Sequence, residues 1–428
     1  MAPGVAAGAA DDRRVLLAWL PHTTTVDELA EAGFSPGIMS AGLGAVSAEQ
    51  TYLDVGQGNR VFNSLYDRPL PEHRGDAARW WREVVERAES APADIVPGLL
   101  ATTLKSAGPV ARLEVLRSSI RRLSLSPGTL TIAIARPTGR SDAPLPIGIS
   151  GPGFDGNLTS DSTRMDGYVL STDVAPTILE WFGIPVPSEM SGRPIRSEGS
   201  VDTGSIEALG SRMEVISSRR GPVIGLPIAA WLLLTVGVAL IAGSALAGPA
   251  VRVLALSIVY LPLLLLLGAA LEPGEVTEAL LVGLGAPALA ALTLASAPGY
   301  RALAVASALT VAAYAVDVIA GSPLTSLSLL GPNPGLGVRF YGIGNELEAL
   351  LAVLVIAGTG AGLTGFAPRG SKRAAAVAFL VCGFLAAAVF AAGRFGADVG
   401  AGIVFPVGAA VAAVSIAGRG RRPMALAV

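Results

Sequence analysis

Residues Val223 to Leu271 read VIGLPIAAWLLLTVGVALIAGSALAGPAVRVLALSIVYLPLLLLLGAAL, and Arg252 is the only charged residue among them. An α-helix rises about 1.5 Å per residue, so about 20 apolar residues are needed to cross the ~30 Å hydrocarbon core of a bilayer. The stretch is long enough to cross the core twice. It therefore predicts an integral membrane protein.

Further apolar stretches follow, separated by turns that contain Gly, Pro or charged residues. Together they number seven and cover residues 226–247, 251–271, 277–297, 302–321, 347–366, 374–392 and 399–417. They are rich in Ala and Gly, and such small side chains let helix backbones approach closely in lipid. We expect residues 225–428 to form an all-α transmembrane bundle of about seven helices.

The first 220 residues contain most of the charged side chains and alternate between strand-like and helix-like segments. Short apolar runs suited to buried strands are interleaved with helical patterns. The clearest strand-like runs are 15–20, 129–135, 147–150 and 167–170, and the clearest helical ones are 26–32, 76–89 and 173–182, the last with Asp173 as its N-cap. The pattern predicts an α/β domain over residues 13–200, with a parallel-type sheet flanked by helices, and a linker at 201–224.

Composition excludes some functional classes. The net charge is -2, with 15% charged residues, so the chain lacks the basic character of a nucleic-acid-binding protein. Cys382 is the only cysteine and lies in an apolar run, which excludes an intramolecular disulfide and a cysteine-based metal cluster. We expect Cys382 to pack as a small hydrophobic residue.

The N-terminus has two interpretations. Ala7 and Ala9 in the segment VAAGAA have the A-x-A spacing of a signal-peptidase site, and charged residues follow directly. Residues 1–12 are then the remnant of a secretory signal, with the apolar part encoded upstream. The alternative is a disordered Ala/Gly tail, because no apolar segment precedes these residues here.

The distribution of basic residues predicts the orientation. If the helices alternate, one side of the membrane receives Arg252, Arg301, the Arg369–Arg373 cluster and the Arg419–Arg422 tail. The positive-inside rule assigns this side to the cytoplasm, which places the α/β domain outside the cell membrane. Arg219 and Arg220, just before the first apolar stretch, argue for the opposite orientation.

One segment of the α/β domain resembles a known family. Tyr168–Ile195, YVLSTDVAPTILEWFGIPVPSEMSGRPI, is similar to the closing segment of alkaline-phosphatase-superfamily domains. Phe34–Met39 and Ile95–Gly108 are weaker matches, so the resemblance covers residues 13–197. It implies an alkaline-phosphatase-like sheet flanked by helices. In that family, carboxylates and histidines hold two divalent ions that activate a Ser or Thr nucleophile.

The chain departs from the family's chemistry. It has only two histidines, His22 and His73, and Leu158–Gly167 reads LTSDSTRMDG where family members typically show a metal-binding Asp-His-Gly. We therefore expect a catalytically degenerate domain, a pseudoenzyme with no catalytic residues, metal or cofactor, in which phosphatase or phosphotransferase activity is absent.

Milder alternatives remain for individual polar residues of this domain. His22 is either a remnant ligand or the end of a strand before a Thr-rich helix cap. The carboxylates Asp155, Asp161 and Asp166 either bind one hard cation such as calcium or belong to a solvated loop.

Two motifs of the membrane half carry the more unusual residues. Asn333–Glu348 reads NPGLGVRFYGIGNELE, and Gly393–Gly400 reads GRFGADVG. Charged groups at the edge of hydrocarbon are unfavourable unless they are paired or hydrated. We therefore expect a polar cavity near the outer face whose binding residues are Arg339, Tyr341, Asn345, Glu346, Glu348, Arg394 and Asp398.

These residues suggest two functions and a third, structural interpretation. Arg side chains bind phosphate bidentately and Gly admits a headgroup, which favours binding of an anionic lipid or a lipid-linked cell-envelope intermediate, with an envelope protein as a further partner. The alternatives are a membrane transporter and a non-catalytic envelope scaffold. The string RFYGIGNE resembles one in uncharacterised multi-span bacterial proteins with phosphatase-like ectodomains, which offer no activity to transfer.

Overall fold

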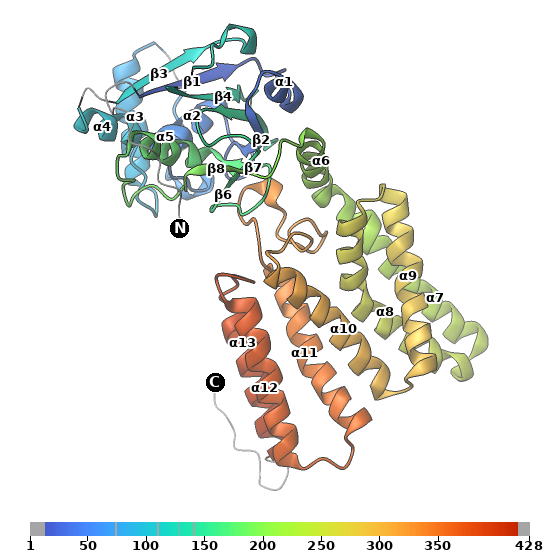
Figure 1. The fold of residues 1–428 in the computed structure, drawn as a ribbon. Coiled ribbons are helices and arrows are strands. Elements are labelled where there is room, and N and C mark those ends of the chain that lie inside the picture. The colour runs from blue at the N-terminus through green and yellow to red at the C-terminus, as the bar shows by residue number, and fades with distance from the viewer. Residues whose placement is uncertain (1–12, 73–74, 109–110, 127, 140–141, 418–428) are drawn as a thin grey trace. The chain divides into compact units, whose positions relative to one another are not determined.

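The computed structural model describes residues 13–72, 75–108, 111–126, 128–139 and 142–417. The chain forms two compact units (Figure 1). We call Met1–Glu214 with Pro334–Phe340 the α/β unit, and Val215–Asn333 with Tyr341–Val428 the helical unit. The predicted signal remnant at 1–12, His73 and the basic tail Arg419–Arg422 lie outside the described residues.

The α/β unit is built on a six-stranded sheet with the order β3-β1-β4-β5-β2-β7. The strands are β1 (Arg14–Leu20), β2 (Ser35–Ser40), β3 (Arg112–Arg117), β4 (Thr129–Ala135), β5 (Leu145–Ser150) and β7 (Tyr168–Leu170). β5 is antiparallel to both of its neighbours, whereas the other pairs are parallel. The expectation of a parallel-type sheet is therefore wrong: the sheet is mixed, because the connection between Ala135 and Leu145 is shorter than the dozen or more residues that a parallel crossover needs.

Helices cover both faces of this sheet. Its core joins strand residues to α2 (Ala48–Gln57), α4 (Leu99–Ser106) and α5 (Val174–Phe182) on one face. On the other face α1 (Val26–Glu31) packs through Leu29 against β1 and β4. The unit also contains α3 (Ala77–Glu89), most of α6 (Thr203–Arg220), and a second sheet of β6 (Asn157–Ser160) and β8 (Ile195–Glu198). This confirms a sheet flanked by helices.

The helical unit consists of apolar helices that coincide with the predicted stretches. They are α7 (Leu226–Ala242), α8 (Ser244–Leu271), α9 (Glu275–Ser296), α10 (Tyr300–Ile319), α11 (Asn345–Phe366), α12 (Lys372–Ala391) and α13 (Ala401–Ala417). Within the described residues, six helices, the first running on from α6, are long and apolar enough to cross a membrane; α13 is shorter. The chain is thus a multi-pass membrane protein.

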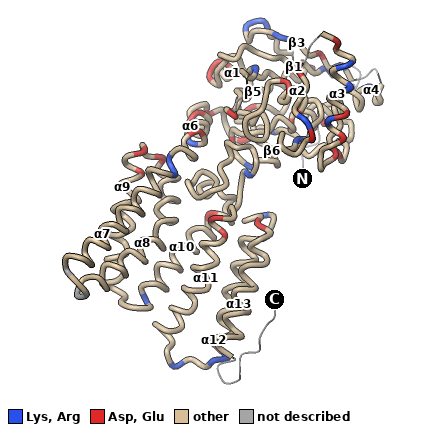
Figure 2. Tube along the Cα trace, turned by 180° about the vertical axis from the view of Figure 1, so that it is seen from behind, with Lys and Arg blue, Asp and Glu red and all other residues tan. Residues whose placement is uncertain are grey.

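Charges lie at the ends of the helical unit. Basic residues mark the turn between α11 and α12, and acidic residues mark the turn between α8 and α9 (Figure 2). The connections alternate between the two ends as expected for successive crossings. Assignment of the basic end to the cytoplasm stays a prediction from the positive-inside rule.

Candidate functional site

The two polar motifs of the membrane half meet in the helical unit. Gly342 has a positive φ of 79°, and a Cβ placed there would lie 1.9 Å from the Gly396 carbonyl oxygen. The Ile343 amide donates to that same oxygen at 3.1 Å. The space in front of Gly342, which could have admitted a headgroup, is therefore filled by the backbone of Gly396.

Two predicted carboxylates face a common space beside Gly400. Glu348, in the first turns of α11, is 7% exposed, and Asp398, just before α13, is 2% exposed. A Cβ placed on Gly400 would lie 2.9 Å from Glu348 Oε2 and 3.0 Å from Asp398 Oδ1. Glu348 Oε1 is buried and has no hydrogen-bond partner among the described residues. The structure thus brings together Glu348 and Asp398, two of the residues that the sequence assigned to one polar cavity.

Helix ends explain how two carboxylates are tolerated here. Asp398 Oδ1 accepts the Ala401 amide at 3.1 Å at the start of α13. Glu348 lies in the N-terminal part of α11, where the helix dipole also favours negative charge. The site is therefore assembled from the starts of two helices.

The other predicted site residues are placed differently. Glu346 was expected near Arg339 or Arg394, but it forms an ion pair with Arg220 (Oε2 to Nη1, 3.6 Å). The Arg394 guanidinium lies 5.9 Å from the Phe395 ring centroid. Tyr341 and Asn345 belong to the helical unit, whereas Arg339 belongs to the α/β unit. Convergence of Arg339 and Arg394 stays a prediction.

Arg219 and Arg220, the basic pair before the first span, form contacts within the helical unit that the sequence did not indicate. Arg219 Nη1 contacts Glu278 Oε2 at 3.0 Å, and the Glu278 side chain is fully buried. Arg220 also donates to the Gly331 carbonyl at 3.2 Å. These arginines therefore hold together segments of the helical unit that lie far apart in the chain.

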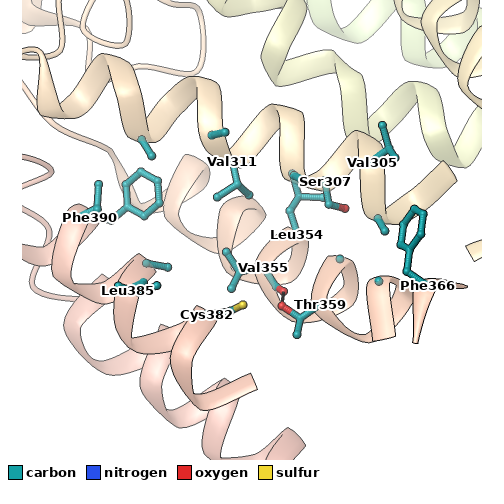
Figure 3. Close-up of a pocket in the computed structure, with 18 residues that line it drawn as sticks. Val305, Ser307, Val311, Leu354, Val355, Thr359, Phe366, Cys382, Leu385 and Phe390 are labelled. Carbon is teal, nitrogen blue, oxygen red and sulfur yellow. Dashed lines mark hydrogen bonds between the residues drawn. The ribbon is translucent and has the colours of Figure 1, made fainter. Parts of the chain in front are cut away.

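An apolar cavity of about 560 Å³ lies between α10, α11 and α12 (Figure 3). Val311, Leu354, Val355 and Leu385 are among its lining residues, and Cys382 directs its sulfur toward α11. Phe390 also lines the cavity, and its carbonyl oxygen accepts the Asp398 amide at 3.1 Å. The polar turn before α13 is therefore hydrogen-bonded to a residue that lines the cavity. No sequence motif predicts this cavity, because the residues that line it come from three separate helices.

The acidic loop residues of the α/β unit each have a local partner. Asp161 forms an ion pair with Arg196, and Asp166 accepts a hydrogen bond from Asn157. Asp155 accepts one from the Ser197 hydroxyl at 3.4 Å. Within the described ranges, no group of three or more His, Cys, Asp or Glu residues could hold a metal ion.

The start of α1 favours the milder interpretation of the Thr-rich segment. The Thr25 hydroxyl accepts the Glu28 amide, and the Glu28 carboxylate accepts the Thr25 amide, which is a complete capping box. His22 lies on the exposed turn between β1 and this cap.

Asp173 differs from the expected N-cap of the helix that follows. Its side chain makes no cap hydrogen bond to α5. Instead its carboxylate accepts four hydrogen bonds, from the Ser160 and Ser162 hydroxyls and from the Leu170 and Arg193 amides. Burial raises the pKa of Asp173, and these hydrogen bonds oppose the rise. Asp173 thus links β6, β7 and the segment that precedes β8.

The segment Pro334–Phe340 is part of the α/β unit although it follows α10 in sequence. Three donors hold its backbone carbonyls: the Tyr168 hydroxyl on Pro334 (3.1 Å), the Gly44 amide on Leu336 (2.9 Å) and Arg60 Nη2 on Gly337 (2.8 Å). Burial raises the pKa of Tyr168 to about 12, so its hydroxyl stays protonated and able to donate. About half of the Asn333–Glu348 motif, the segment Pro334–Phe340, thus belongs to the α/β unit.

No protein-family model, curated protein or solved structure matches the chain. Its chemistry is therefore inferred from the geometry. The helical unit combines an apolar cavity among candidate membrane helices with a polar turn that is hydrogen-bonded to the cavity-lining residue Phe390. Such a combination can bind an amphipathic molecule.

Proposed function

We propose that this multi-pass membrane protein binds a phosphate-bearing lipid, or a lipid-linked intermediate of the cell envelope, in its helical unit. The observation that carries the proposal is the apolar cavity of about 560 Å³ lined by α10, α11 and α12. These helices are candidate membrane spans, so the cavity opens among lipid chains. Its occupant is therefore a hydrocarbon chain. Van der Waals packing holds the chain there, because the hydrophobic effect gives little driving force within a bilayer.

The headgroup end of the site is the turn Gly393–Gly400. Arg394 in this turn supplies a planar guanidinium, which suits a phosphate because two parallel N–H groups can bind it. The turn adjoins the cavity through Phe390, whose carbonyl accepts the Asp398 amide. The carboxylates of Glu348 and Asp398 repel any negatively charged group beyond the phosphate on Arg394. The site therefore suits a headgroup that also carries a hydrogen-bond donor for these carboxylates, such as a hydroxyl or an amine.

Cys382 offers a direct test because it is the chain's only cysteine and lines the cavity. The purified protein in a neutral detergent is treated with a small maleimide, with and without phosphatidylglycerol. We expect the lipid to slow modification at least tenfold. A matched control moves the cysteine to the outward-facing neighbour of the same helix, as Cys382→Ala with Val381→Cys, where 49% of the valine is exposed. Equal protection at both positions contradicts occupancy of the cavity.

Filling the cavity tests the same proposal by mass spectrometry. Val355 is 8% exposed and lines the cavity, whereas Val353 on the same helix is 61% exposed and does not. We expect Val355→Trp to abolish co-purification of anionic lipid and Val353→Trp to leave it unchanged. Retention of the lipid in both variants contradicts the proposal.

For the α/β unit we propose a degenerate phosphatase-like domain with a docking role outside the cytoplasm. The sequence motivates this proposal, because the chain has only two histidines, His22 and His73, and Leu158–Gly167 reads LTSDSTRMDG. The test uses the full chain, because Pro334–Phe340 belongs to the unit. Elemental analysis should find no stoichiometric zinc; two zinc ions per chain with chelator-sensitive phosphatase activity would contradict the proposal.

The proposed orientation is tested in intact cells. In a Cys382→Ala background, a cysteine at Ser200 should react with an impermeant thiol reagent. A cysteine at Ser371, in the basic turn before α12, should react only after the membrane is permeabilised. The reverse pattern inverts the orientation and places the α/β unit in the cytoplasm.

The buried carboxylates favour transport as a second candidate function. Ionisable groups within membrane helices mark proton and ion pathways, and Glu348 retains an oxygen with no partner among the described residues. If the protein moves the lipid with a proton, labelled phosphatidylglycerol should cross reconstituted vesicles faster under a pH gradient, and Glu348→Gln should remove the effect of the gradient. No acceleration by the wild-type protein excludes transport while leaving binding intact.

A further inference from the structure

A second, smaller cavity lies in the α/β unit between α2, α3 and the start of α4. It has a volume of about 280 Å³ and is lined by Glu49, Tyr52, Leu53, Gly56, Trp80, Trp81 and Gly98. We call it the aromatic groove. Neither polar motif of the membrane half contributes to it, so it is independent of the lipid site proposed above.

The aromatic rings of the groove are held in position. The Trp80 indole N–H donates to the Pro71 carbonyl at 2.9 Å. The Trp80 and Trp81 ring centroids are 6.2 Å apart with the planes inclined at 46°, and the Tyr52 ring stands edge-on against Trp19 at 4.5 Å. Trp81 is nevertheless 40% exposed, which leaves a large indole surface facing the groove and solvent.

Gly56 lines the groove, and neither its backbone conformation nor its packing requires a glycine. A glycine inside a helix destabilises it by roughly 1 kcal/mol relative to alanine. Gly56 lies inside α2 and does not have a positive φ, and a Cβ placed there meets nothing within 4 Å. Packing therefore does not require glycine at this position. A side chain here would extend into the groove, so the glycine preserves space for a ligand.

The charge at the groove identifies the kind of ligand. Glu49, in the first turn of α2, contributes a carboxylate at the rim. Among the described residues, this carboxylate makes no ion pair and accepts no hydrogen bond. Aromatic faces carry partial negative charge and attract organic cations. Three aromatic rings and one carboxylate therefore favour a cation.

The scarcity of polar lining atoms narrows the choice further. A primary ammonium carries three N–H donors that need acceptors, whereas a quaternary ammonium carries none. Glu49 is the only lining residue with a charged side chain, and the Trp80 N–H is already used. We propose that the aromatic groove binds a quaternary ammonium group, such as the trimethylammonium group of choline or of a choline lipid.

Calorimetry on the full chain in a neutral maltoside detergent tests the proposal. Tetramethylammonium chloride is the probe, and sodium chloride at equal ionic strength gives the background. We expect saturable binding that Gly56→Leu weakens at least tenfold, because leucine fills the groove without a backbone clash. Gly204→Leu is the matched control, since Gly204 is an exposed glycine at the start of α6.

A second pair of variants tests the charge without altering the shape. Glu49→Gln should weaken tetramethylammonium binding about fivefold, while Glu31→Gln, on the exposed end of α1, should not change it. Ethylammonium should bind more weakly than tetramethylammonium. No saturable heat with the wild-type protein, or unchanged affinity in Gly56→Leu, would overturn the proposal.

Two further titrations distinguish the source of the ammonium group. Free choline is compared with vesicles of phosphatidylcholine, using phosphatidylglycerol vesicles as the reference for lipid contact alone. Binding of choline but not of phosphatidylcholine indicates a soluble ligand, and preference for phosphatidylcholine that is lost in Gly56→Leu indicates a membrane headgroup. Failure of both arms contradicts the aromatic groove as a site and leaves the cavity between α10, α11 and α12 unaffected.

Discussion

Asp173 of the α/β unit and Glu348 of the helical unit are both buried carboxylates near the start of a helix, but their surroundings differ. Asp173 accepts four hydrogen bonds from protein donors. Glu348 shares a space with Asp398 and keeps Oε1 without a partner among the described residues. A carboxylate satisfied by the fold stabilises it, whereas an unsatisfied one marks a place where a proton or ligand can enter.

The largest expected effect follows from the satisfied carboxylate. Asp173→Ala leaves two hydroxyls and two amides without their acceptor, so we expect it to destabilise the α/β unit by about 3 kcal/mol or more. Denaturant unfolding followed by tryptophan fluorescence reports mainly on this unit, because Trp231 is the only one of the five tryptophans that lies in the helical unit. Asp155→Ala, in the exposed loop, is the control. Similar stability of both variants would mean that Asp173 is not a structural acceptor.

The packed glycine of the helical unit should rank second. Gly342→Ala combines a positive φ of 79° with a Cβ 1.9 Å from the Gly396 oxygen, so we expect a loss of roughly 2 to 3 kcal/mol. Gly344→Ala meets nothing within 4 Å and should be nearly neutral. Exposure of Cys382 to a thiol-reactive dye on heating measures both variants. Equal melting temperatures would show that the two motifs do not pack as described.

A third buried carboxyl, Asp54 of the α/β unit, should make the stability of the protein depend on pH. Burial raises the pKa of Asp54 from 3.8 to about 7, against hydrogen bonds from Gln50 and Gln57 and the charges of Arg60 and Arg87. The folded state then keeps a proton that the unfolded state releases, so this contribution to stability is complete below pH 3.8 and is lost as pH rises to about 7.

Replacement of Asp54 should reveal that contribution. The loss amounts to at most about 1.4 kcal/mol per pH unit, and the contribution no longer changes above pH 7. Asp54→Asn should therefore flatten the decline of stability between pH 4 and pH 7, as followed by tryptophan fluorescence in denaturant at each pH. An unchanged pH profile in this variant would place the pKa of Asp54 near its ordinary value.

The unsatisfied carboxylate should respond in the opposite way to Asp173. Glu348→Gln removes a charge that faces Asp398. The free energy of unfolding of the helical unit should therefore stay the same or rise by up to about 0.5 kcal/mol, and its melting temperature should not fall. Asp398→Asn weakens the α13 cap and should cost about 1 kcal/mol. A strong loss of stability in Glu348→Gln would make Glu348 a structural residue and end the contrast with Asp173.

The smallest effect on stability is expected at Arg394. Arg394→Lys keeps the charge and loses the planar fork, so it should change stability by less than about 0.5 kcal/mol while weakening retention of anionic lipid severalfold. Native mass spectrometry with phosphatidylglycerol measures the retention. Full retention in the Lys variant would mean that Arg394 does not bind the phosphate through its fork.

The sequence by itself determined the membrane character, the positions of the apolar helices and the α/β pattern. These properties depend on local run length and periodicity, which tertiary contacts rarely override in runs as long as 226–242 or 345–366. It also identified the residues that meet beside Gly400, because buried charges in apolar surroundings are conspicuous in any sequence.

Only the tertiary structure decided how those residues are partnered. The packing of Gly342 on Gly396, the pairing of Glu346 with Arg220 and the cavity around Cys382 each join segments that are separated by at least one helix. The same holds for Pro334–Phe340, which follows α10 in sequence but completes the α/β unit through Arg60 and Tyr168. Such contacts are set by the packing of whole helices and sheets, so residue spacing along the chain carries no record of them.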